Sequence, residues 1–137
     1  MLKRNRKIKI VIGKAGIDGH WRGIQYIAIA LKNAGIEVVY AGSLTADALL
    51  ETAIQEDADI IGVHVGASTK QIENLIKNMK KRQIEDVKVI IGGTIPLPDI
   101  PRLKELGVGA VFPPGSNVGD IIKYIQENAR IMESAAK

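Results

Sequence analysis

Residues 8–34 read IKIVIGKAGIDGHWRGIQYIAIALKNA, and the rest of the fold can be worked out from this stretch. Residues 8–12 are a short apolar run rich in isoleucine, which is typical of a buried strand. Residues 14–23 are rich in glycine, which lets a backbone turn tightly and approach a ligand. Residues 24–34 carry apolar side chains at helical spacing, on the face shared by Ile24, Ile27, Ala28 and Leu31. The stretch therefore predicts a strand, a loop and a helix, in that order.

The same alternation continues to the end of the chain. Strands are expected at residues 7–13, 36–40, 59–65, 87–91 and 110–112. Helices are expected at residues 23–34, 100–106 and 118–132. Two more helices are expected between them, one starting after an N-cap at Thr45 and one starting after an N-cap at Ser68 or Thr69. Three helices show a clear inward-facing set of apolar residues. We expect Leu49, Leu50 and Ile54 to face inwards on the second helix, and Ile72, Leu75, Ile76 and Met79 on the third. On the fifth helix we expect Ile121, Ile122, Ile125 and Ile131 to do so.

Five strand–helix units in alternation predict an α/β fold with a five-stranded parallel sheet and helices on both faces. We expect the flavodoxin-like (Rossmann-like) strand order 2-1-3-4-5. The order of the strands then reverses between the first and the third strand. Their carboxyl ends carry the 14–23 loop and the 63–68 segment, and open α/β sheets bind ligands at such a point.

Length and composition fit one domain over residues 1–137, with a basic tail at 1–6 and a frayed end at 133–137. Hydrophobic residues make up 46% of the chain, enough for a core, but no apolar run is long enough to span a bilayer. We expect no signal peptide, no membrane association and a cytoplasmic location. There is no cysteine, which excludes disulfides and thiolate chemistry. The net charge of +4 comes largely from residues 1–7 and 77–82, without interleaved aromatic residues, so nucleic acid is not expected as a partner.

The 14–23 loop carries His20, one of two histidines in the chain, with Asp18 two residues before it and Lys14 six before it. A neutral imidazole is a common metal ligand, and its second nitrogen is often oriented by a carboxylate. The residues alone allow two interpretations. Either Asp18 braces a ligating His20 while Lys14 keeps the carboxylate ionised, or His20 is a solvated loop residue beside a helix-capping aspartate.

Other α/β ligand sites are disfavoured by the spacing. Gly13, Gly16 and Gly19 do not have the Gly-x-Gly-x-x-Gly spacing of a dinucleotide site, and no Gly-Lys-Ser/Thr of a P-loop is present. A phospho-receiver domain would end its third strand with an aspartate, where this chain has His64 or Val65. A flavin site would want hydroxyl groups after the first strand, and the 14–23 loop has none.

Residues 18–23, Asp-Gly-His-Trp-Arg-Gly, match the Asp-x-His-x-x-Gly motif of the cobalamin-binding domain found in B12-dependent mutases and corrinoid methyl carriers. Residues 89–96, Val-Ile-Ile-Gly-Gly-Thr-Ile-Pro, also resemble the family pattern. The resemblance runs from about residue 7 to residue 125. It is greatest to the small subunit, or C-terminal domain, of acyl-CoA mutases of the methylmalonyl-CoA mutase type.

The resemblance implies a set of site residues. His20 would be the axial ligand to cobalt, with Asp18 and Lys14 behind it, and a slot between the first and third strands would take the nucleotide tail of the cofactor. Gly92 and Gly93 would give the tail room. The implied cofactor-binding residues are Lys14, Gly16, Asp18, Gly19, His20, Gly23, His64, Gly66, Gly92, Gly93, Gly115 and Ser116. From the residues alone, Gly92-Gly93 also fits a tight turn after a strand, and Gly115-Ser116 also fits a Pro-Gly turn.

One segment departs from the family pattern. Where the family has Ser-x-Leu at the end of the third strand, this chain has His64-Val65-Gly66, and the loop that follows looks shorter. Three interpretations of His64 stay open: it donates a hydrogen bond to the tail in place of serine, it fills the slot, or it binds something else.

The resemblance implies a cobalamin-binding small subunit of an adenosylcobalamin-dependent acyl-CoA mutase. Such mutases hold their substrate in a (β/α)8 barrel of roughly 250 residues, so the barrel would lie on a separate large subunit that binds the acyl-CoA. No catalytic residue is expected on this chain alone, and homo-oligomerisation is left open. The alternatives are a corrinoid methyl carrier, although the short 1–6 segment leaves no room for the helical bundle that usually precedes one, and a non-catalytic binding or regulatory module with lost or altered cobalamin binding.

Overall fold

The computed structural model describes residues 7–15, 21–43, 45–66, 69–113 and 115–129. The strands are β1 (Lys9–Ala15), β2 (Glu37–Ser43), β3 (Ile60–Val65), β4 (Lys88–Gly93) and β5 (Ala110–Phe112). The helices are α1 (Trp21–Asn33), α2 (Ala46–Gln55), α3 (Lys70–Lys81), α4 (Asp99–Leu106) and α5 (Val118–Asn128). The predicted alternation of strands and helices is therefore confirmed.

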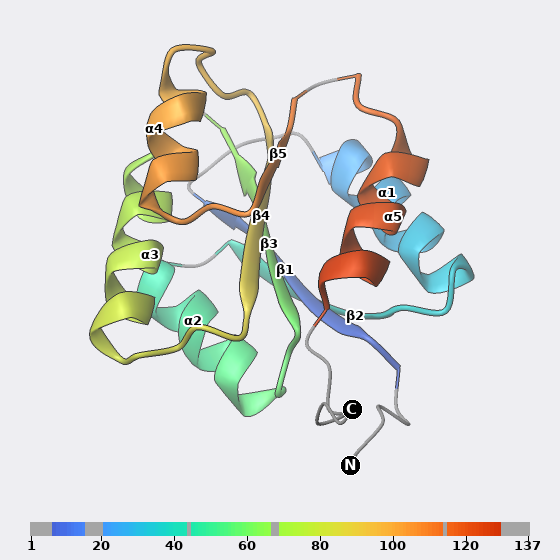
Figure 1. Ribbon diagram of the computed structural model, residues 1–137. Helices are drawn as coiled ribbons and strands as arrows, with labels where there is room; N and C mark the ends of the chain where they lie inside the picture. The colour runs from blue at the N-terminus through green and yellow to red at the C-terminus, as the bar shows by residue number, and fades with distance from the viewer. Residues whose placement is uncertain (1–6, 16–20, 44, 67–68, 114, 130–137) are drawn as a thin grey trace.

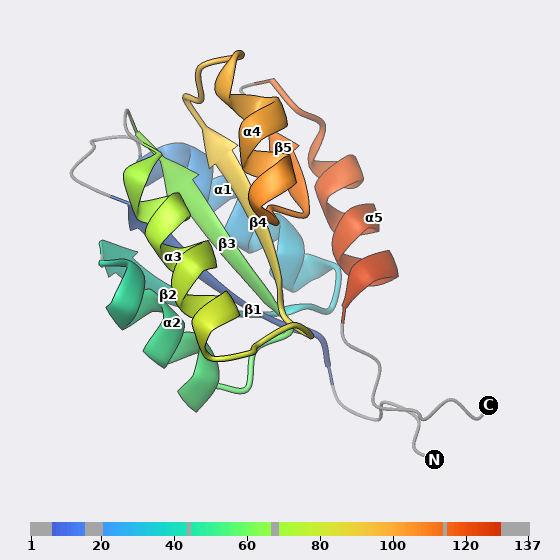
Figure 2. The ribbon, with the colours of Figure 1, turned by 60° about the vertical axis from the view of Figure 1, so that its left-hand side comes forward.

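The five strands form one parallel sheet in the order β2-β1-β3-β4-β5, as predicted. The chain passes from β1 outward to β2 and then back across β1 to β3, after which it continues in that direction to β5. Right-handed crossovers that run in opposite directions place their helices on opposite faces. Accordingly α2, α3 and α4 cover one face of the sheet, whereas α1 and α5 cover the other (Figures 1 and 2).

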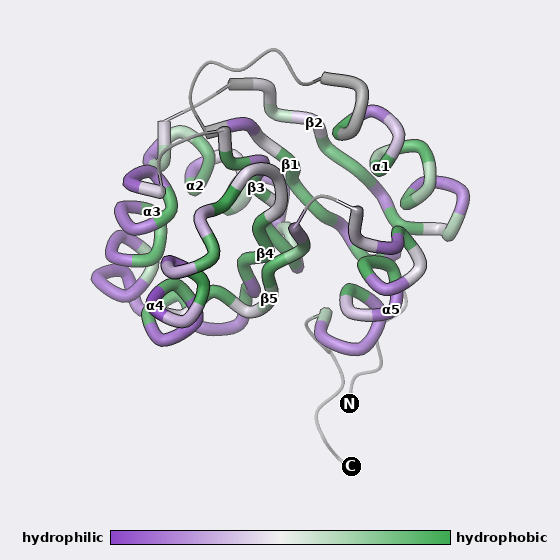
Figure 3. Tube along the Cα trace, turned by 90° about the horizontal axis from the view of Figure 1, so that it is seen from above, coloured by the Kyte–Doolittle hydropathy of each residue, from purple (hydrophilic) through white to green (hydrophobic). Residues whose placement is uncertain are grey.

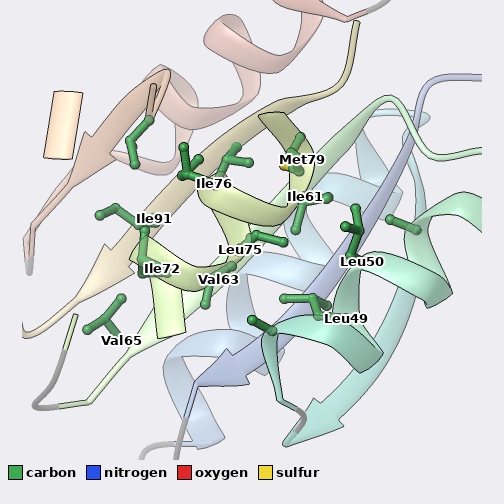
Figure 4. Close-up of a cluster of buried hydrophobic side chains, with 14 of the residues drawn as sticks. Leu49, Leu50, Ile61, Val63, Val65, Ile72, Leu75, Ile76, Met79 and Ile91 are labelled. Atoms are coloured by element: carbon green, nitrogen blue, oxygen red, sulfur yellow. The ribbon is translucent and has the colours of Figure 1, made fainter. Parts of the chain in front are cut away.

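Each face of the sheet has its own hydrophobic core, because alternate side chains of a strand point to opposite faces. On the α2–α4 side, Leu49 and Leu50 of α2 and Leu75 of α3 pack with Ile61 and Val63 of β3 (Figure 4). On the α1–α5 side, the buried residues are Ile10, Ile12, Ile24, Leu31, Ile36, Ile60, Ile90, Ile121 and Ile125. Seen from above, the middle of the sheet is mostly hydrophobic and the outer sides of α3, α4 and α5 are mostly hydrophilic (Figure 3).

Two details of the helices differ from the prediction. Ile54, predicted to face inwards, is 41% exposed, because the buried face of α2 is made by Ala46, Leu49, Leu50 and Ala53 and Ile54 lies at its edge. Thr45 caps α2 as predicted, since its hydroxyl oxygen accepts a hydrogen bond from the backbone N–H of Ala48 (3.2 Å). Thr69 occupies the N-cap position of α3 but makes no capping hydrogen bond, because its backbone is not in the extended conformation that a cap adopts. Ser68, the other candidate, lies outside the described residues.

Three strands run further toward their carboxyl ends than predicted. β1 includes Lys14 and Ala15, because pairing with β3 continues through Lys14↔His64 and Ala15↔Val65. β2 reaches Ser43 by pairing with Lys14, after a register shift that follows Ile12. β4 likewise includes Gly92 and Gly93, which pair with His64 and Val65.

The last helix is shorter than predicted, and a glycine follows each of two other helices. α5 ends at Asn128 rather than at Met132, since Ala129 takes an extended conformation. Gly35 and Gly107, which follow α1 and α4, both have positive φ angles (86° and 132°). Ile131 and the predicted tails at 1–6 and 133–137 lie outside the described residues. Within the described ranges, every helix falls short of the length and apolarity that a bilayer crossing requires.

Candidate ligand-binding site

The site is built on two rows of side chains that cross the sheet. Lys14, His64, Gly92 and Phe112 are register partners along one row. Ile12, Gly62, Ile90 and Ala110 form the next row toward the amino ends of the strands. Because register partners in a parallel sheet point to the same face, both rows face α1 and α5.

A cavity of about 560 Å³ lies between this face of the sheet and the helices α1 and α5. Its apolar walls come from β1, β3, β4, α1 and α5, and it reaches the carboxyl edge of the sheet, where Gly115 and Ser116 are exposed. We refer to this cavity as the slot. Its lining residues are Ile10, Ile12, Ile24, Tyr26, Ile27, Leu31, Gly62, Val63, His64, Ile90, Ile91, Gly92, Gly93, Thr94, Phe112, Pro113, Gly115, Ser116, Val118 and Ile121.

The slot exists because two positions in the rows carry no side chain. A β-carbon on Gly62 would stand 3.2 Å from Cδ1 of Ile10 and 3.6 Å from Cγ1 of Ile12. A β-carbon on Gly92 would stand 3.2 Å from the carbonyl oxygen of Phe112. The two glycines thus form a flat floor among isoleucines. Gly62 was not among the predicted site residues, although a glycine inside the apolar run 60–63 is a signal for close approach of a ligand.

Gly93 and His64 are in direct contact at the carboxyl edge. Gly93 has a φ angle of 98°, and a β-carbon there would collide with the carbonyl oxygen of Val65 and stand 3.0 Å from both Cε1 and Nδ1 of His64. The backbone N–H of Thr94 donates to the Val65 carbonyl oxygen (3.0 Å). Gly93 is therefore required both by its backbone conformation and by the imidazole beside it.

His64 is half-buried and belongs to the lining of the slot. Gly66 follows β3 and is half-buried, but it does not line the slot. The structure thus places His64 at the slot and leaves Gly66 outside it.

Gly115 and Ser116 form a tight turn that also lines the slot. Gly115 has a φ angle of 88°, and the hydroxyl of Ser116 donates to the carbonyl oxygen of Pro113 (2.6 Å). The backbone N–H of Ser116 donates to the same oxygen (3.1 Å). The two interpretations of this pair, a turn and a contact to the ligand, are thus compatible.

Lys14 lies in β1 rather than in the loop, and it is only 1% exposed. It is the register partner of His64 and points to the slot side of the sheet. Gly23 lies in the first turn of α1. Gly16, Asp18, Gly19 and His20 lie outside the described residues, between the end of β1 at Ala15 and the start of α1 at Trp21. Ala15 ends β1 at the carboxyl edge of the sheet, where it pairs with Val65 of β3.

An aromatic pair supports the outer side of the slot. The ring of Phe112, a lining residue, meets the ring of Tyr124 edge to face, with centroids 6.2 Å apart. Burial raises the pKa of the Tyr124 phenol, so it stays uncharged at neutral pH. In the ranges that the structure describes, no three His, Asp or Glu side chains are grouped as metal ligands would be.

The fold and the slot together define a class of protein: a doubly wound α/β domain that binds a ligand beside the point where its strand order reverses. The pattern of the family described as "B12 binding domain" matches residues 8–123. That match covers most of the chain, so the chain belongs to the B12-binding domain family.

Two relatives are separate small subunits. The chain is 37% identical over 108 residues to the 2-hydroxyisobutanoyl-CoA mutase small subunit of Aquincola tertiaricarbonis, covering 77% of this chain and 79% of the relative. It is 30% identical over 122 residues to the pivalyl-CoA mutase small subunit of Xanthobacter autotrophicus, covering 88% and 82%. Among solved structures, a cobalamin-binding protein from Desulfitobacterium hafniense DCB-2 aligns with a TM-score of 0.73 at 21% identity, over 89% of this chain and 59% of that one. The structural likeness supports the fold.

Proposed function

We propose that this chain is the cobalamin-binding small subunit of an adenosylcobalamin-dependent acyl-CoA mutase. It would act in the cytoplasm with a large subunit that carries a barrel and binds the acyl-CoA. Membership of the B12-binding domain family supports the cofactor, and the two small-subunit relatives support the division into two chains. The single observation that carries the proposal is the slot over Gly62 and Gly92.

The slot fits the nucleotide tail of a cobalamin. Such a tail ends in a flat, largely apolar ring system, and the slot is largely apolar, has two glycines in its floor and is about 560 Å³ in volume. Pockets for small molecules and cofactors commonly measure about 300–1,000 Å³. A β-carbon at Gly62 or Gly92 would occupy space at this floor, so the glycines favour occupation by a flat group.

The residues of this chain would hold and orient the cofactor. His20 would bind the cobalt, Asp18 would fix the orientation of its imidazole, and the buried Lys14 would keep the Asp18 carboxylate ionised. Gly16, Gly19 and Gly23 would let the backbone pass close to the corrin. His64, Gly66, Gly92, Gly93, Gly115 and Ser116 would surround the tail.

When bound, adenosylcobalamin would supply a radical through homolysis of its cobalt–carbon bond. The contribution of this chain would be ligation, orientation and exclusion of water from the slot. Groups that touch the acyl-CoA would lie on the large subunit. The open slot beside His64 argues against the alternative in which the domain has lost its ligand.

Titration of the purified chain with adenosylcobalamin tests the proposal. Binding should be saturable, with one cobalamin per chain measured by equilibrium dialysis. A chain carrying Gly92→Val, which would place a branched side chain on the slot floor, should bind much less. Failure of the unaltered, folded chain to bind adenosylcobalamin would overturn the proposal. Retention of methylcobalamin alone would favour the methyl-carrier alternative.

A further inference from the structure

The helix α1 carries apolar side chains on its outward side as well as on its buried side. Ile24 and Leu31 are buried against the sheet, whereas Tyr26 is 64% exposed and Ile29 is 58% exposed. Figure 3 shows α1 beside α5 at one flank of the domain. A helix that is apolar nearly all round is normally covered on all sides. The outward side of α1 therefore has the character of a surface that another protein covers.

The outward sides of two other helices are polar by contrast. The exposed side chains of α3 are all lysines, namely Lys70, Lys77, Lys80 and Lys81. Those of α5 are charged or carry an amide, namely Asp120, Lys123, Gln126 and Glu127. Contact with water accounts for these two helices, because their exposed groups are hydrated. It does not account for the large apolar side chains on α1.

The exposed residues of α1 are arranged symmetrically along the helix. Within residues 24–33, where its side chains are described, they are Gln25, Tyr26, Ile29, Lys32 and Asn33. Tyr26 and Lys32 lie three residues before and after Ile29, and the two amides lie four residues before and after it. Residues three or four apart share one face of a helix, so the five side chains form a single stripe centred on Ile29.

The stripe is complementary to a reversed copy of itself. If two α1 helices pack antiparallel about a two-fold axis at Ile29, each Tyr26 meets Lys32 of the second copy, and each Gln25 meets Asn33. An ammonium group is attracted to the face of an aromatic ring, and two amides can exchange hydrogen bonds. The two Lys32 side chains stay about 9 Å apart along the helix axis, so like charges are not opposed. Self-complementarity of this kind is what a two-fold interface requires.

We propose that the outward side of α1 is a self-association surface, which pairs two copies of this chain through antiparallel α1 helices centred on Ile29. The inference goes beyond the proposed function and does not depend on the cofactor. A contact one helix long extends over only about 20 Å. Stable complexes bury about 1,200–2,000 Å² of surface, so we expect a weak dimer that dissociates on dilution.

Sedimentation velocity on a dilution series of the full chain tests the association. The unaltered chain should pass from dimer to monomer on dilution. Ile29→Glu would place two carboxylates opposite each other at the two-fold axis, and should weaken dimerisation by at least about tenfold. The control is Ile54→Glu, because Ile54 is also an exposed isoleucine (41%) but lies on α2. Dimerisation of Ile54→Glu should be unchanged.

Two outcomes of the dilution series would overturn the inference. One is an unaltered chain that stays monomeric throughout, which would leave the outward side of α1 to a different protein, such as a large mutase subunit. The other is undiminished dimerisation of Ile29→Glu whose helix content is unchanged by circular dichroism. Ile29 does not line the slot, so adenosylcobalamin should bind Ile29→Glu as it binds the unaltered chain. Failure of the inference is thus distinguishable from failure of the proposed function.

Introduced cysteines test the register. The chain has no cysteine, so a disulfide between copies can form only at an introduced one. Under mild oxidation Ile29→Cys should give a covalent dimer, because residue 29 faces its own counterpart across the axis and a disulfide needs Cα atoms within about 7 Å. Ile54→Cys should give much less. Equal yields of covalent dimer from the two variants would contradict the antiparallel pairing at Ile29.

Discussion

The imidazole of His64 lies against Gly93, with its Cε1 and Nδ1 atoms each 3.0 Å from the point where a β-carbon on that glycine would stand. The contact joins the ends of β3 and β4 at the carboxyl edge. Gly93 and His64 both line the slot at this edge, its rim, whereas Gly62 lies two residues before His64 in β3, on the slot floor. The rim depends on Gly93 and the floor on Gly62, so variants of the two glycines test the two parts of the slot separately.

Gly93→Ala tests the contact at the rim. A methyl group there would meet the Val65 carbonyl oxygen and the His64 ring, in addition to the strain of a φ angle of 98°. We expect the free energy of unfolding in urea to fall by about 1–3 kcal/mol. Gly115→Ala is the control, because its φ angle is 88° but nothing lies within 4 Å of its β-carbon. Equal losses for both variants would contradict the packing role of His64.

Gly62→Ala tests the floor of the slot. The added methyl group would stand 3.2 Å from Cδ1 of Ile10 and narrow the slot, so adenosylcobalamin affinity should fall by about tenfold, measured by equilibrium dialysis. The control is Gly13→Ala in β1, whose β-carbon would face the opposite core, 3.0 Å from Cδ1 of Leu49. Gly13→Ala should lower stability without weakening the binding of cobalamin to the folded protein. Weaker cobalamin binding by Gly13→Ala, with unchanged binding by Gly62→Ala, would place the ligand on the other face of the sheet.

His64→Ser tests whether the imidazole stands in for the serine found at this position in the family. A hydroxyl group would replace the imidazole at the rim and the slot would be widened, so binding of adenosylcobalamin should stay within about threefold of the unaltered chain or become tighter. His64→Phe, which keeps a ring against Gly93 without a polar atom, is the comparison. A sharp loss of affinity in His64→Ser would show that the imidazole itself is needed.

The Glu73–Arg102 ion pair between α3 and α4 gives a pH dependence that does not involve the slot. Arg102 donates a hydrogen bond to Glu73 (2.8 Å), and this holds the pKa of the carboxyl below its ordinary value of 4.5. The pair thus stabilises the fold above pH 4.5, and its contribution is lost as the pH falls through the lowered value. Arg102→Met should lower the free energy of unfolding in urea at neutral pH. The loss should be smaller in acid, where Glu73 is protonated. A larger loss of unfolding free energy in acid than at neutral pH would contradict the stabilising role of the Glu73–Arg102 pair.

The sequence predicted the fold well because strands and helices alternate with clear periodicities. The strand order followed from that alternation, and Thr45 marked the start of α2 correctly. The error at Ile54 arose because an apolar side chain at the edge of a helix face satisfies the same spacing as an inward one. Which residues border the face depends on the neighbouring helix, and periodicity does not contain that information.

The candidate site was predicted less completely. Gly92, Gly93, Gly115, Ser116 and His64 were expected at the ligand, and all five line the slot. Gly62 was missed, because its importance depends on isoleucines of the neighbouring strands that only the register brings beside it. The predicted roles of Asp18 and His20 lie outside the described residues and remain predictions.

The most direct test of the account is the absorbance spectrum of cobalamin bound to the unaltered chain and to His20→Ala. We expect the unaltered chain to give the spectrum of a cobalamin whose own base has left the cobalt and been replaced by a histidine. Folded His20→Ala protein should lose that histidine-bound spectrum, whereas His64→Ala should keep it. An unchanged spectrum in His20→Ala would contradict the assignment of the axial ligand, on which the account depends.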